Sequence, residues 1–418
     1  MRLFLFDDDT ARGWAPFART RPAGEILFGA LSLRARIERV AGLHAEGYLG
    51  PSELEGFDEA GAPPVLRAGA TGSDSTTNEG TRLVLCSRYV PPIEPGKPLP
   101  VPQDAPAGGV QLFAKGVGVG WLLPGGTPVP LSGQDARPVA PPVGGTLELP
   151  GDVLQSPWDL VAQNGGQLRV DLPALFGGSR RAGAEALPWT GVHPIGEHGL
   201  TWEEGVQVDP AVVLDTREGP VHLGAGVVVR PFTHLRGPAW IGNGTTLLGG
   251  TIEAVSAGPG CKLRGEISES VILGHTNKAH DGYLGHSLVG HWVNLGAFTT
   301  NSDLKNNYGQ VRVATENGEV DSGLLKVGVF LGDHAKTGIG SRLGAGTSVG
   351  AGSNLFGAGM APKWVPPFTW WDGTSVEPYR LDAFLATAEK ATARRGVSLT
   401  DGQRALFGRL WSAARGSR

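Results

Sequence analysis

Two stretches in the second half of the sequence carry an aliphatic residue, in one case a threonine, at every sixth position. The positions are Leu223, Val229, Leu235, Ile241 and Leu247, then Leu325, Leu331, Thr337, Leu343, Val349 and Leu355. A period of six matches neither an α-helix, whose period is about 3.6, nor the simple alternation of a strand. It is typical of hexapeptide repeats, in which three short strands and three turns make one triangular coil. The sequence therefore predicts a left-handed parallel β-helix.

This β-helix is expected to occupy residues 191–365. With roughly 18 residues per coil, the repeats from Gly191 to Ala361 would make about eight to nine coils. The aliphatic residue of each hexad is expected to point into the prism, and glycine or another small residue to form each tight corner. The register is lost between Thr300 and Gly323. An insertion of this kind usually forms a loop on one face of a solenoid, often the binding face.

Residues 1–190 predict a short α/β domain. The apolar run Leu3–Phe6 predicts a strand that ends at Asp7-Asp8-Asp9. Apolar spacing between Gly24 and Val40 predicts an amphipathic helix. Further strands are predicted over 83–89, 110–113, 117–123 and 168–172, with a helix over 156–164.

Residues 366–418 predict a C-terminal helical extension. Helices are expected over 381–395 and 400–414, and Thr400 and Gln403 have the spacing of a capping box at the start of the second. The apolar stripe of that helix is expected to pack on the solenoid or on a neighbouring subunit. The stripe consists of Leu406, Phe407, Leu410 and Trp411.

Composition narrows the classes of function. A formal net charge of −4 gives no basic field for nucleic acid. No apolar run approaches the ~20 residues that span a bilayer. Cys86 and Cys261 are too far apart in sequence for a metal or redox motif. We expect a cytoplasmic enzyme without a nucleic-acid or membrane partner.

The residues with the most chemical potential lie between Gly274 and Gly309, a stretch with four of the ten histidines. It contains His280-x-x-Tyr283-Leu284-Gly285 and then Asn294-Leu295-Gly296-Ala297. These motifs resemble the acetyltransferase half of the bacterial bifunctional enzyme that makes UDP-N-acetylglucosamine. The whole chain also resembles a variant branch of that family described as sugar nucleotidyltransferases, most strongly from Val213 to Pro367.

The resemblance implies acetyl transfer from acetyl-CoA to an amino-sugar phosphate, with His280 as the general base. An imidazole suits this role because it exchanges protons near neutral pH. By the same residue-by-residue match, Tyr283 would contact the sugar phosphate and Asn294 the sugar or the acyl group. Ala297 and Ala351 would line the coenzyme A groove. The resemblance further implies a homotrimer in which coenzyme A lies between adjacent prisms. Without the family match, His280 would be interpreted as a structural residue at a corner of the coil, and Tyr283 as an aromatic residue at the edge of the core.

The lysines that bind the sugar phosphate in that family have no counterpart in register here. Glu269 and Ser322 stand at those positions. Lys262 and Lys278 are the nearest lysines before and after Glu269, and they are therefore candidate phosphate contacts. Glucosamine 1-phosphate is the expected acceptor.

For the N-terminal domain the resemblance implies nucleotidyl transfer to a sugar 1-phosphate from a nucleoside triphosphate. Arg12 and Arg21 are the candidate nucleotide-binding residues, because guanidinium groups match phosphate geometry. Asp7 and Asp8 are candidate ligands for the Mg²⁺ that such a transfer requires. The alternative is a solvated turn in which nearby arginines pair with these carboxylates.

Two other functions stay open. Left-handed β-helices also carry zinc sites of the carbonic anhydrase type, formed by imidazoles of neighbouring subunits. His286 and His291 have a suitable separation, with His275, His280 and His334 near them. The other alternative is a non-catalytic sugar-nucleotide-binding or scaffold protein.

Overall fold

The computed structural model describes residues 1–67, 80–132, 137–138, 144–177, 180–181 and 187–416. Two compact units divide the chain. The N-terminal unit comprises Met1–Ile26, Leu31–Ser156 and Leu399–Ala413, and the coil unit comprises Leu27–Ala30, Pro157–Ser398 and Ala414–Arg418. The division between them after Ser156 lies earlier than the boundary near residue 190 that the sequence suggests.

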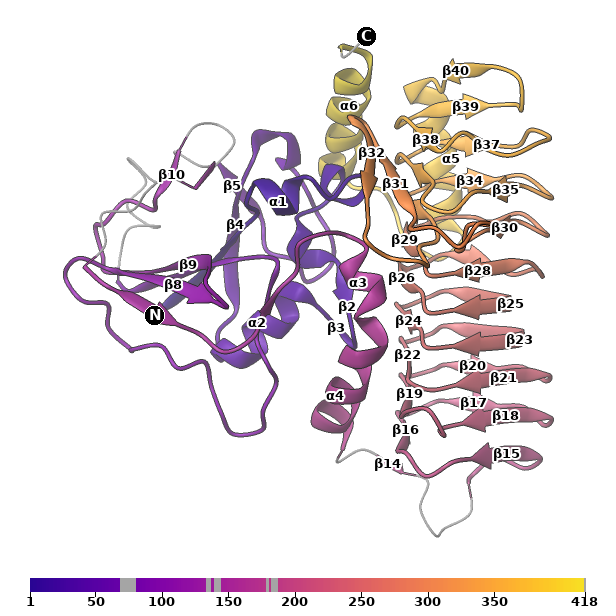
Figure 1. The fold of residues 1–418 in the computed structure, drawn as a ribbon, viewed down its shortest axis with the longest axis horizontal. Coiled ribbons are helices and arrows are strands. Elements are labelled where there is room, and N and C mark those ends of the chain that lie inside the picture. The colour runs from indigo at the N-terminus through magenta and orange to yellow at the C-terminus, as the bar shows by residue number, and fades with distance from the viewer. Residues whose placement is uncertain (68–79, 133–136, 139–143, 178–179, 182–186, 417–418) are drawn as a thin grey trace. The chain divides into compact units, whose positions relative to one another are not determined.

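Short parallel strands stack coil on coil in the coil unit (Figure 1). The first face contains β16 (Leu200–Trp202), β19 (Val221–Leu223), β22 (Ala239–Ile241), β24 (Ser256–Ala257), β26 (Val271–Gly274), β29 (Leu288–His291), β33 (Phe330–Leu331), β36 (Ser348–Val349) and β38 (Trp364–Val365). The second face contains β17 (Gln207–Val208), β20 (Val228–Val229), β27 (Asn277–Lys278), β34 (Lys336–Thr337) and β37 (Asn354–Leu355). The third contains β18 (Val212–Asp215), β21 (Thr233–Arg236), β28 (Tyr283–Gly285), β30 (Thr300–Asn301) and β35 (Arg342–Leu343). Strands β23 (Thr246–Glu253) and β25 (Lys262–Ser268) run across the corner between the second and third faces. The predicted parallel β-helix is confirmed.

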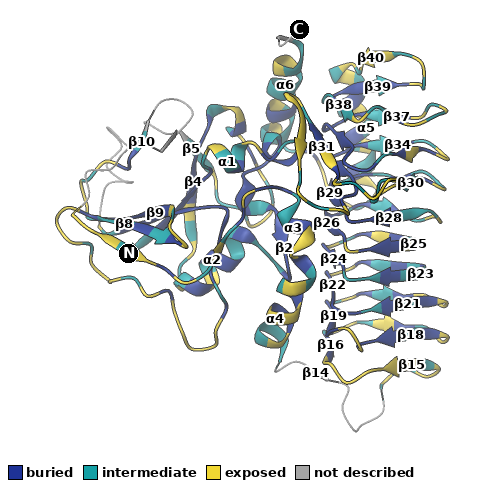
Figure 2. Cartoon of the chain, in the orientation of Figure 1, coloured by how far each residue is buried: buried dark blue, intermediate teal, exposed yellow. Residues whose placement is uncertain are grey.

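The repeated hexad residues fill the interior of the coils. All five residues of the first run are fully buried, and Leu331, Leu343, Val349 and Leu355 of the second run are at most 2% exposed. Figure 2 shows the buried residues continuing along the stack of strands. Leu325 is the exception at 56% exposed. The prediction that it points into the prism is wrong, because this leucine lies in the inserted segment and the second run begins at Leu331.

In three coils the corner between the first and second faces departs from the expectation of small residues, whereas glycine occupies it at Gly226, Gly244, Gly260 and Gly352. His275, Trp292 and His334 occupy it in the left-handed backbone region, with φ values of 53°, 61° and 59°. This conformation costs roughly 1–2 kcal/mol for a residue other than glycine. The rings of His275 and Trp292 stack at 4.3 Å with an interplanar angle of 6°. Ring stacking between successive coils therefore takes the place of small corner residues.

The predicted insertion leaves the coils between β30 and β33. It carries an antiparallel hairpin of β31 (Arg312–Thr315) and β32 (Gly318–Asp321). Its first residues stay fixed to the coil, since the Asn301 side chain bonds both the N–H and the C=O of Gly285.

The N-terminal unit contains a mixed seven-stranded sheet, which confirms the predicted α/β class. Its order is β12-β8-β9-β6-β1-β4-β5. The strands are β1 (Arg2–Phe6), β4 (Ala45–Gly50), β5 (Val65–Arg67), β6 (Arg82–Cys86), β8 (Val110–Ala114), β9 (Val117–Leu123) and β12 (Thr146–Glu148). β1 lies centrally and is parallel to β4 and β6, while β9 is antiparallel to β6 and β8. The strands predicted at the start of the chain, after residue 82 and after residue 109 are confirmed.

One predicted helix begins later than expected, and one predicted strand is wrong. Helix α2 (Leu33–Ala41) begins at Leu33, nine residues after Gly24. The Ser32 hydroxyl caps its first turn by accepting from the N–H of Ala35 at 3.2 Å. The strand predicted over 168–172 is part of helix α4 (Asn164–Phe176), which follows the short helix α3 (Asp159–Ala162). Leu168 and Leu172 are four residues apart and both buried, which is the spacing of one helix face.

Both C-terminal helices form, as α5 (Leu381–Ala393) and α6 (Asp401–Gly416). The capping box is confirmed: Gln403 Oε1 accepts from the N–H of Thr400, and the Thr400 hydroxyl accepts from the N–H of Gln403, each at 3.1 Å. The predicted packing of the α6 stripe is wrong at Leu406, which joins an apolar cluster with Leu54 and Phe57 of the N-terminal unit. Among the described residues, no helix is long and apolar enough to cross a membrane.

We predict that Gly258→Ala destabilises the coils by about 3 kcal/mol, at the upper end of what overpacking costs. A Cβ at this position would lie 1.8 Å from the carbonyl oxygen of Leu273 on the next coil. Gly199→Ala is the matched control, since its added Cβ would meet nothing within 4 Å. Urea unfolding of both variants measures the difference. Equal midpoints would contradict the close stacking of the coils at Gly258.

Candidate functional site

A column of polar side chains runs along the second face of the coils. Its members are Lys262, Asn277, Asn294 and Lys336, each bridged to the next by main-chain pairing of neighbouring coils. The Asn277 side-chain amide donates to Asn294 Oδ1 at 3.0 Å. The column lines a cavity of about 450 Å³ whose other wall is α5. Of the residues predicted to bind substrate, the structure brings Lys262 and Asn294 together here.

Lys278 points into the coil rather than onto its surface. It pairs in register with Leu263, an interior residue, and is only 2% exposed. Its Nζ donates to the carbonyl oxygens of Arg264 and His280, each at 2.9 Å. Burial lowers the pKa of Lys278 to about 8. Lys278 is therefore placed to hold the backbone at His280, and its amine does not face a ligand.

His280 lies on the turn between β27 and β28, and its side chain is exposed. No hydrogen bond or ion pair of its ring is formed with the described residues. The backbone of this turn is fixed at one end by Lys278 and at the other by Asp281, whose carbonyl accepts from the N–H of Phe298 at 2.9 Å. The predicted base is thus an accessible imidazole on a firmly held turn.

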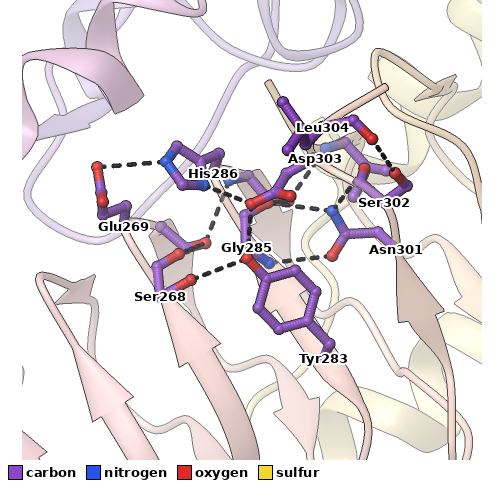
Figure 3. Close-up of polar contacts among 12 residues, drawn as sticks. Ser268, Glu269, Tyr283, Gly285, His286, Asn301, Ser302, Asp303 and Leu304 are labelled. Atoms are coloured by element: carbon purple, nitrogen blue, oxygen red, sulfur yellow. Dashed lines mark hydrogen bonds and ion pairs between the residues drawn. The ribbon is translucent and has the colours of Figure 1, made fainter. Parts of the chain in front are cut away.

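Tyr283, the predicted sugar-phosphate contact, belongs to a buried polar cluster on the third face (Figure 3). Its hydroxyl donates to Asp303 Oδ2 at 2.6 Å and lies 3.1 Å from the Ser268 hydroxyl. His286 Nδ1 lies 2.7 Å from the same Asp303 oxygen. His286 Nε2 lies 3.3 Å from Glu269. One carboxylate from the inserted segment therefore holds two side chains of the coil.

The charges of this cluster are set by its two carboxylates. Burial opposes charge on His286, but its hydrogen bonds to Asp303 and Glu269 outweigh burial and raise its pKa to about 9. Burial and the hydrogen bond to Asp303 raise the pKa of Tyr283. Burial works against ionisation of Asp303 too, yet the hydrogen bonds from His286 and Tyr283 lower its pKa. At neutral pH His286 is a cation with both ring nitrogens engaged, so it is an anchor for Asp303 and no free base.

The two predicted coenzyme A contacts lie at different corners. Ala297 is half-buried on the turn between the second and third faces, where its carbonyl accepts from the N–H of Gly340 at 2.8 Å. Ala351 is 1% exposed on the turn between the first and second faces. A single chain does not bring them together.

The predicted nucleotide and metal residues of the N-terminal unit are engaged with protein groups. Arg12 donates from Nε to the Asp7 carbonyl at 3.0 Å, and Arg21 is 1% exposed and ion-paired with Glu59 at 2.6 Å. Asp7 is buried, accepts from the N–H of Ala23 at 2.8 Å, and has its pKa raised to about 6 by burial. These side chains form the interior of the loop after β1.

Asp7 and Asp8 do not fit a Mg²⁺ site in this arrangement. Both carboxylate oxygens of Asp8 accept from Arg88 Nε at 2.8–2.9 Å, and one of them also caps α1 (Asp9–Arg12) by accepting from Ala11. In the described part of the chain, no three His, Cys, Asp or Glu side chains gather where they could hold a metal ion. The alternative of a solvated turn is half right, because an arginine does pair with Asp8 but the loop is largely buried.

The histidines of the zinc hypothesis do not form one cluster in the described part of the chain, although the rings of His275 and His291 lie 6.0 Å apart. His286 is engaged by two carboxylates, and His275 stacks on Trp292. His334 is 3% exposed beneath α5, with its ring edge-to-face against Phe384 at 5.7 Å.

Sequence reasoning missed several residues of these sites. Asp303 and Arg88 carry the two central ion pairs, and Lys336, Lys390 and Arg395 line the cavity. Asp303 had one available indication, since it stands just where the hexad register breaks. The α5 cations had none, because their position depends on how a distant helix packs.

We predict a pH-dependent contribution of His286 to stability. Because its pKa is raised from an ordinary value near 6.5 to about 9, the stabilisation is fully present below about pH 6.5 and is lost as the pH rises through 9. A shift of this size corresponds to roughly 3 kcal/mol. Urea unfolding of wild type and His286→Gln should show a gap that narrows over this range, whereas the exposed control His198→Gln should show none. A gap independent of pH would contradict the charged cluster.

Known proteins similar to this chain include sugar nucleotidyl transferases and bifunctional nucleotidyltransferase/acetyltransferases. Residues 3–91 match the family model described as sugar nucleotidyl transferase. The chain is 36% identical over 74 residues to the bifunctional sugar-1-phosphate nucleotidylyltransferase/acetyltransferase of Sulfurisphaera tokodaii, covering 18% of each chain. It is 30% identical over 111 residues to the bifunctional protein GlmU of Methanocaldococcus jannaschii, covering 27% of this chain and 22% of the relative. With that of Synechococcus elongatus it is 31% identical over 173 residues, covering 32% and 34%.

Solved structures similar to the chain include two acyltransferases. One is an Arabidopsis UDP-N-acetylglucosamine acyltransferase, with a TM-score of 0.23 and 11% identity over 55% of this chain and 93% of that one. The other is the polysialic acid O-acetyltransferase OatWY, with a TM-score of 0.16 and 14% identity over 44% and 86%.

The chain spans between about a fifth and a third of the length of the curated relatives it matches. Over these partial lengths, the resemblance to bifunctional nucleotidyltransferase/acetyltransferases is confirmed. The N-terminal residues 3–91 carry the pattern of the sugar nucleotidyl transferase family, followed in the same chain by a parallel β-helix.

Proposed function

We propose that this chain is a sugar-phosphate transferase of amino-sugar nucleotide synthesis, whose coils transfer an acetyl group from acetyl-CoA to the amine of an amino-sugar phosphate. The observation that carries the proposal is the position of His280. Its exposed imidazole stands on a held turn, three residues before Tyr283, and Asn294 lies on the next coil of the adjoining face. A general base must be accessible and fixed in place, and His280 meets both conditions.

In this transfer the His280 imidazole takes a proton from the neutral sugar amine as the nitrogen attacks the thioester carbonyl. The C–N bond forms and a tetrahedral oxyanion develops, which backbone N–H groups of the coil would stabilise. The oxyanion then collapses, the C–S bond breaks, and the thiolate of coenzyme A receives the proton. Tyr283 and Asn294 would orient the acceptor, with Tyr283 itself held by Asp303.

A homotrimer is part of the proposal. Ala297 and Ala351 lie at different corners of one coil stack, so a groove lined by both requires a second chain. Ala351 is 1% exposed in the single chain, so its contact with a ligand would be through the backbone of its turn.

For the N-terminal unit we propose nucleotidyl transfer from a nucleoside triphosphate to a sugar 1-phosphate. The match of residues 3–91 to the sugar nucleotidyl transferase family supports this assignment. Arg12 is the half-buried cation of the loop after β1 and the residue proposed to contact phosphate. Mg²⁺ is expected to accompany the triphosphate, but Asp7 and Asp8 are not its ligands in this arrangement.

A non-catalytic, nucleotide-binding N-terminal unit is the second candidate. The ion pairs Arg21–Glu59 and Arg88–Asp8 favour it. In a catalytic site these arginine and aspartate side chains would contact the substrate or its metal ion instead of one another.

We predict that the purified chain releases coenzyme A thiol from acetyl-CoA in the presence of glucosamine 1-phosphate. His280→Ala should lower this rate about 100-fold or more, the usual contribution of a general base. Thiol release is followed by a chromogenic disulfide reagent, and gel filtration checks that the variant keeps its oligomeric state.

His198→Ala is the matched control, since His198 is exposed on an early coil and has no place in the proposed site. Full activity of His280→Ala would overturn the assignment of the base. Stoichiometric zinc that is lost in His286→Ala and His291→Ala would instead favour the carbonic anhydrase-type alternative.

We predict pyrophosphate release when the chain meets a matching nucleoside triphosphate, sugar 1-phosphate and Mg²⁺. Arg12→Ala should slow this release about tenfold or more, because a charged phosphate contact contributes roughly 1.5–3 kcal/mol. Arg39→Ala is the control, as Arg39 is exposed on α2. If no pyrophosphate is released when UTP, dTTP, ATP, CTP or GTP is combined with any sugar 1-phosphate, transfer is ruled out and the N-terminal unit has the non-catalytic, nucleotide-binding role.

A further inference from the structure

The cavity between the second face of the coils and α5 is lined by five cations. Lys262 and Lys336 come from the coils, and Lys390, Arg394 and Arg395 from the last turns of α5 and the residues after it. Among the described residues that line the cavity there is no carboxylate. Its volume of about 450 Å³ is in the usual range for small-ligand sites.

These five cations lack the acidic partners that three arginines of the coils have. Arg217, Arg236 and Arg264 pair with Asp215, Glu253 and Asp281 at 2.6–3.0 Å. In the described part of the chain, none of the five cavity cations takes part in an ion pair. Cations gathered without a counter-charge repel one another, so an anionic ligand would relieve a cost that the protein alone does not remove.

Lys336 bears a cost of burial in this cavity. It is half-buried, and its Nζ donates only to a neutral group, the carbonyl oxygen of His334 at 3.2 Å. Burial lowers the pKa of Lys336 to about 8. Arg395 acts similarly on its neighbour His275, whose pKa is lowered by burial and then by this positive charge.

A column of stacked rings borders the cations, in which Trp292 lies between His275 and His334 and turns its edge to the cavity. The stacked rings of His275 and Trp292 both line the cavity. Lys262 and Lys336 are the ends of the four-residue column and are three coil steps apart, or roughly 14 Å at about 4.8 Å per step. The positive charge is thus spread over a length that exceeds one phosphate group.

We propose that this cavity binds a nucleotide carrying at least two phosphate groups, with the phosphates held between the coil lysines and the cations of α5 and the base against Trp292. The cavity shares Lys262 and Asn294 with the residues predicted to bind the sugar substrate, but nucleotide binding in it requires no contribution from His280. Coenzyme A and a uridine nucleotide share this chemistry, and direct binding distinguishes them.

Isothermal titration of the full-length chain with coenzyme A, UDP, pyrophosphate and adenosine tests the proposal. At least one nucleotide should bind with micromolar affinity, more tightly than pyrophosphate, while uncharged adenosine should not bind measurably. In Lys390→Ala/Arg394→Ala the affinity should fall about tenfold or more, since both side chains are exposed on α5 and their loss leaves the fold intact.

Arg380→Ala is the matched control, because Arg380 stands at the start of α5, pairs with Asp382 and does not line the cavity. It should bind like wild type, and so should His280→Ala, which would separate this site from the transferase site even if no transfer is found. The ligand of the cavity, coenzyme A or a uridine nucleotide, is the one whose affinity falls in the Lys390→Ala/Arg394→Ala variant. Nucleotide binding that is unchanged in the double variant, equal loss in Arg380→Ala, or no affinity tighter than about 1 mM would overturn the proposal.

Discussion

Main-chain hydrogen bonding between successive coils determines where every surface group of the coil unit lies. The N–H of Lys262 donates to Thr276, that of Asn277 to Val293, that of Asn294 to Ala335 and that of Lys336 to Ser353, all at 2.8–3.0 Å. Residues far apart in sequence therefore stand one above another at a fixed spacing of about 4.8 Å. The polar column, the aromatic corner and the held turn at His280 are three results of this one regularity.

The inserted segment adds side chains to the coil surface that do not follow the six-residue repeat. Asp303 accepts hydrogen bonds from Tyr283 and His286, and Asn301 pairs with both backbone groups of Gly285. Leaving either partner of such a buried ion pair alone is costly, so the anchor fixes the insertion beside the third face. The coil supplies the fixed spacing, and the insertion supplies the acid that orients Tyr283.

The sequence alone was sufficient for the features that depend on local periodicity. The hexads predicted the β-helix, and Thr400 and Gln403 predicted the cap of α6, because both patterns are complete within a few residues. The same local reasoning failed at Leu168 and Leu172, whose burial suits a strand or a helix equally until the neighbouring elements are known.

Features that depend on contacts between distant segments could not be predicted. Lys278 was predicted to contact the sugar phosphate, yet the coil places it inward, where two backbone carbonyls accept from its amine. The cations of α5 belong to a helix more than fifty residues after Lys336, and no spacing rule connects them. His280 and Asn294 were placed by the motif resemblance together with the hexad spacing.

The return of α6 to the N-terminal unit has a consequence for how the chain is made. Leu406 completes an apolar cluster with Leu54 and Phe57, although the whole solenoid is translated between them. On the ribosome, α6 is therefore the last part of the N-terminal unit to be made. A single cut of the chain between Ser156 and Leu399 would separate α6 from the other segments of that unit.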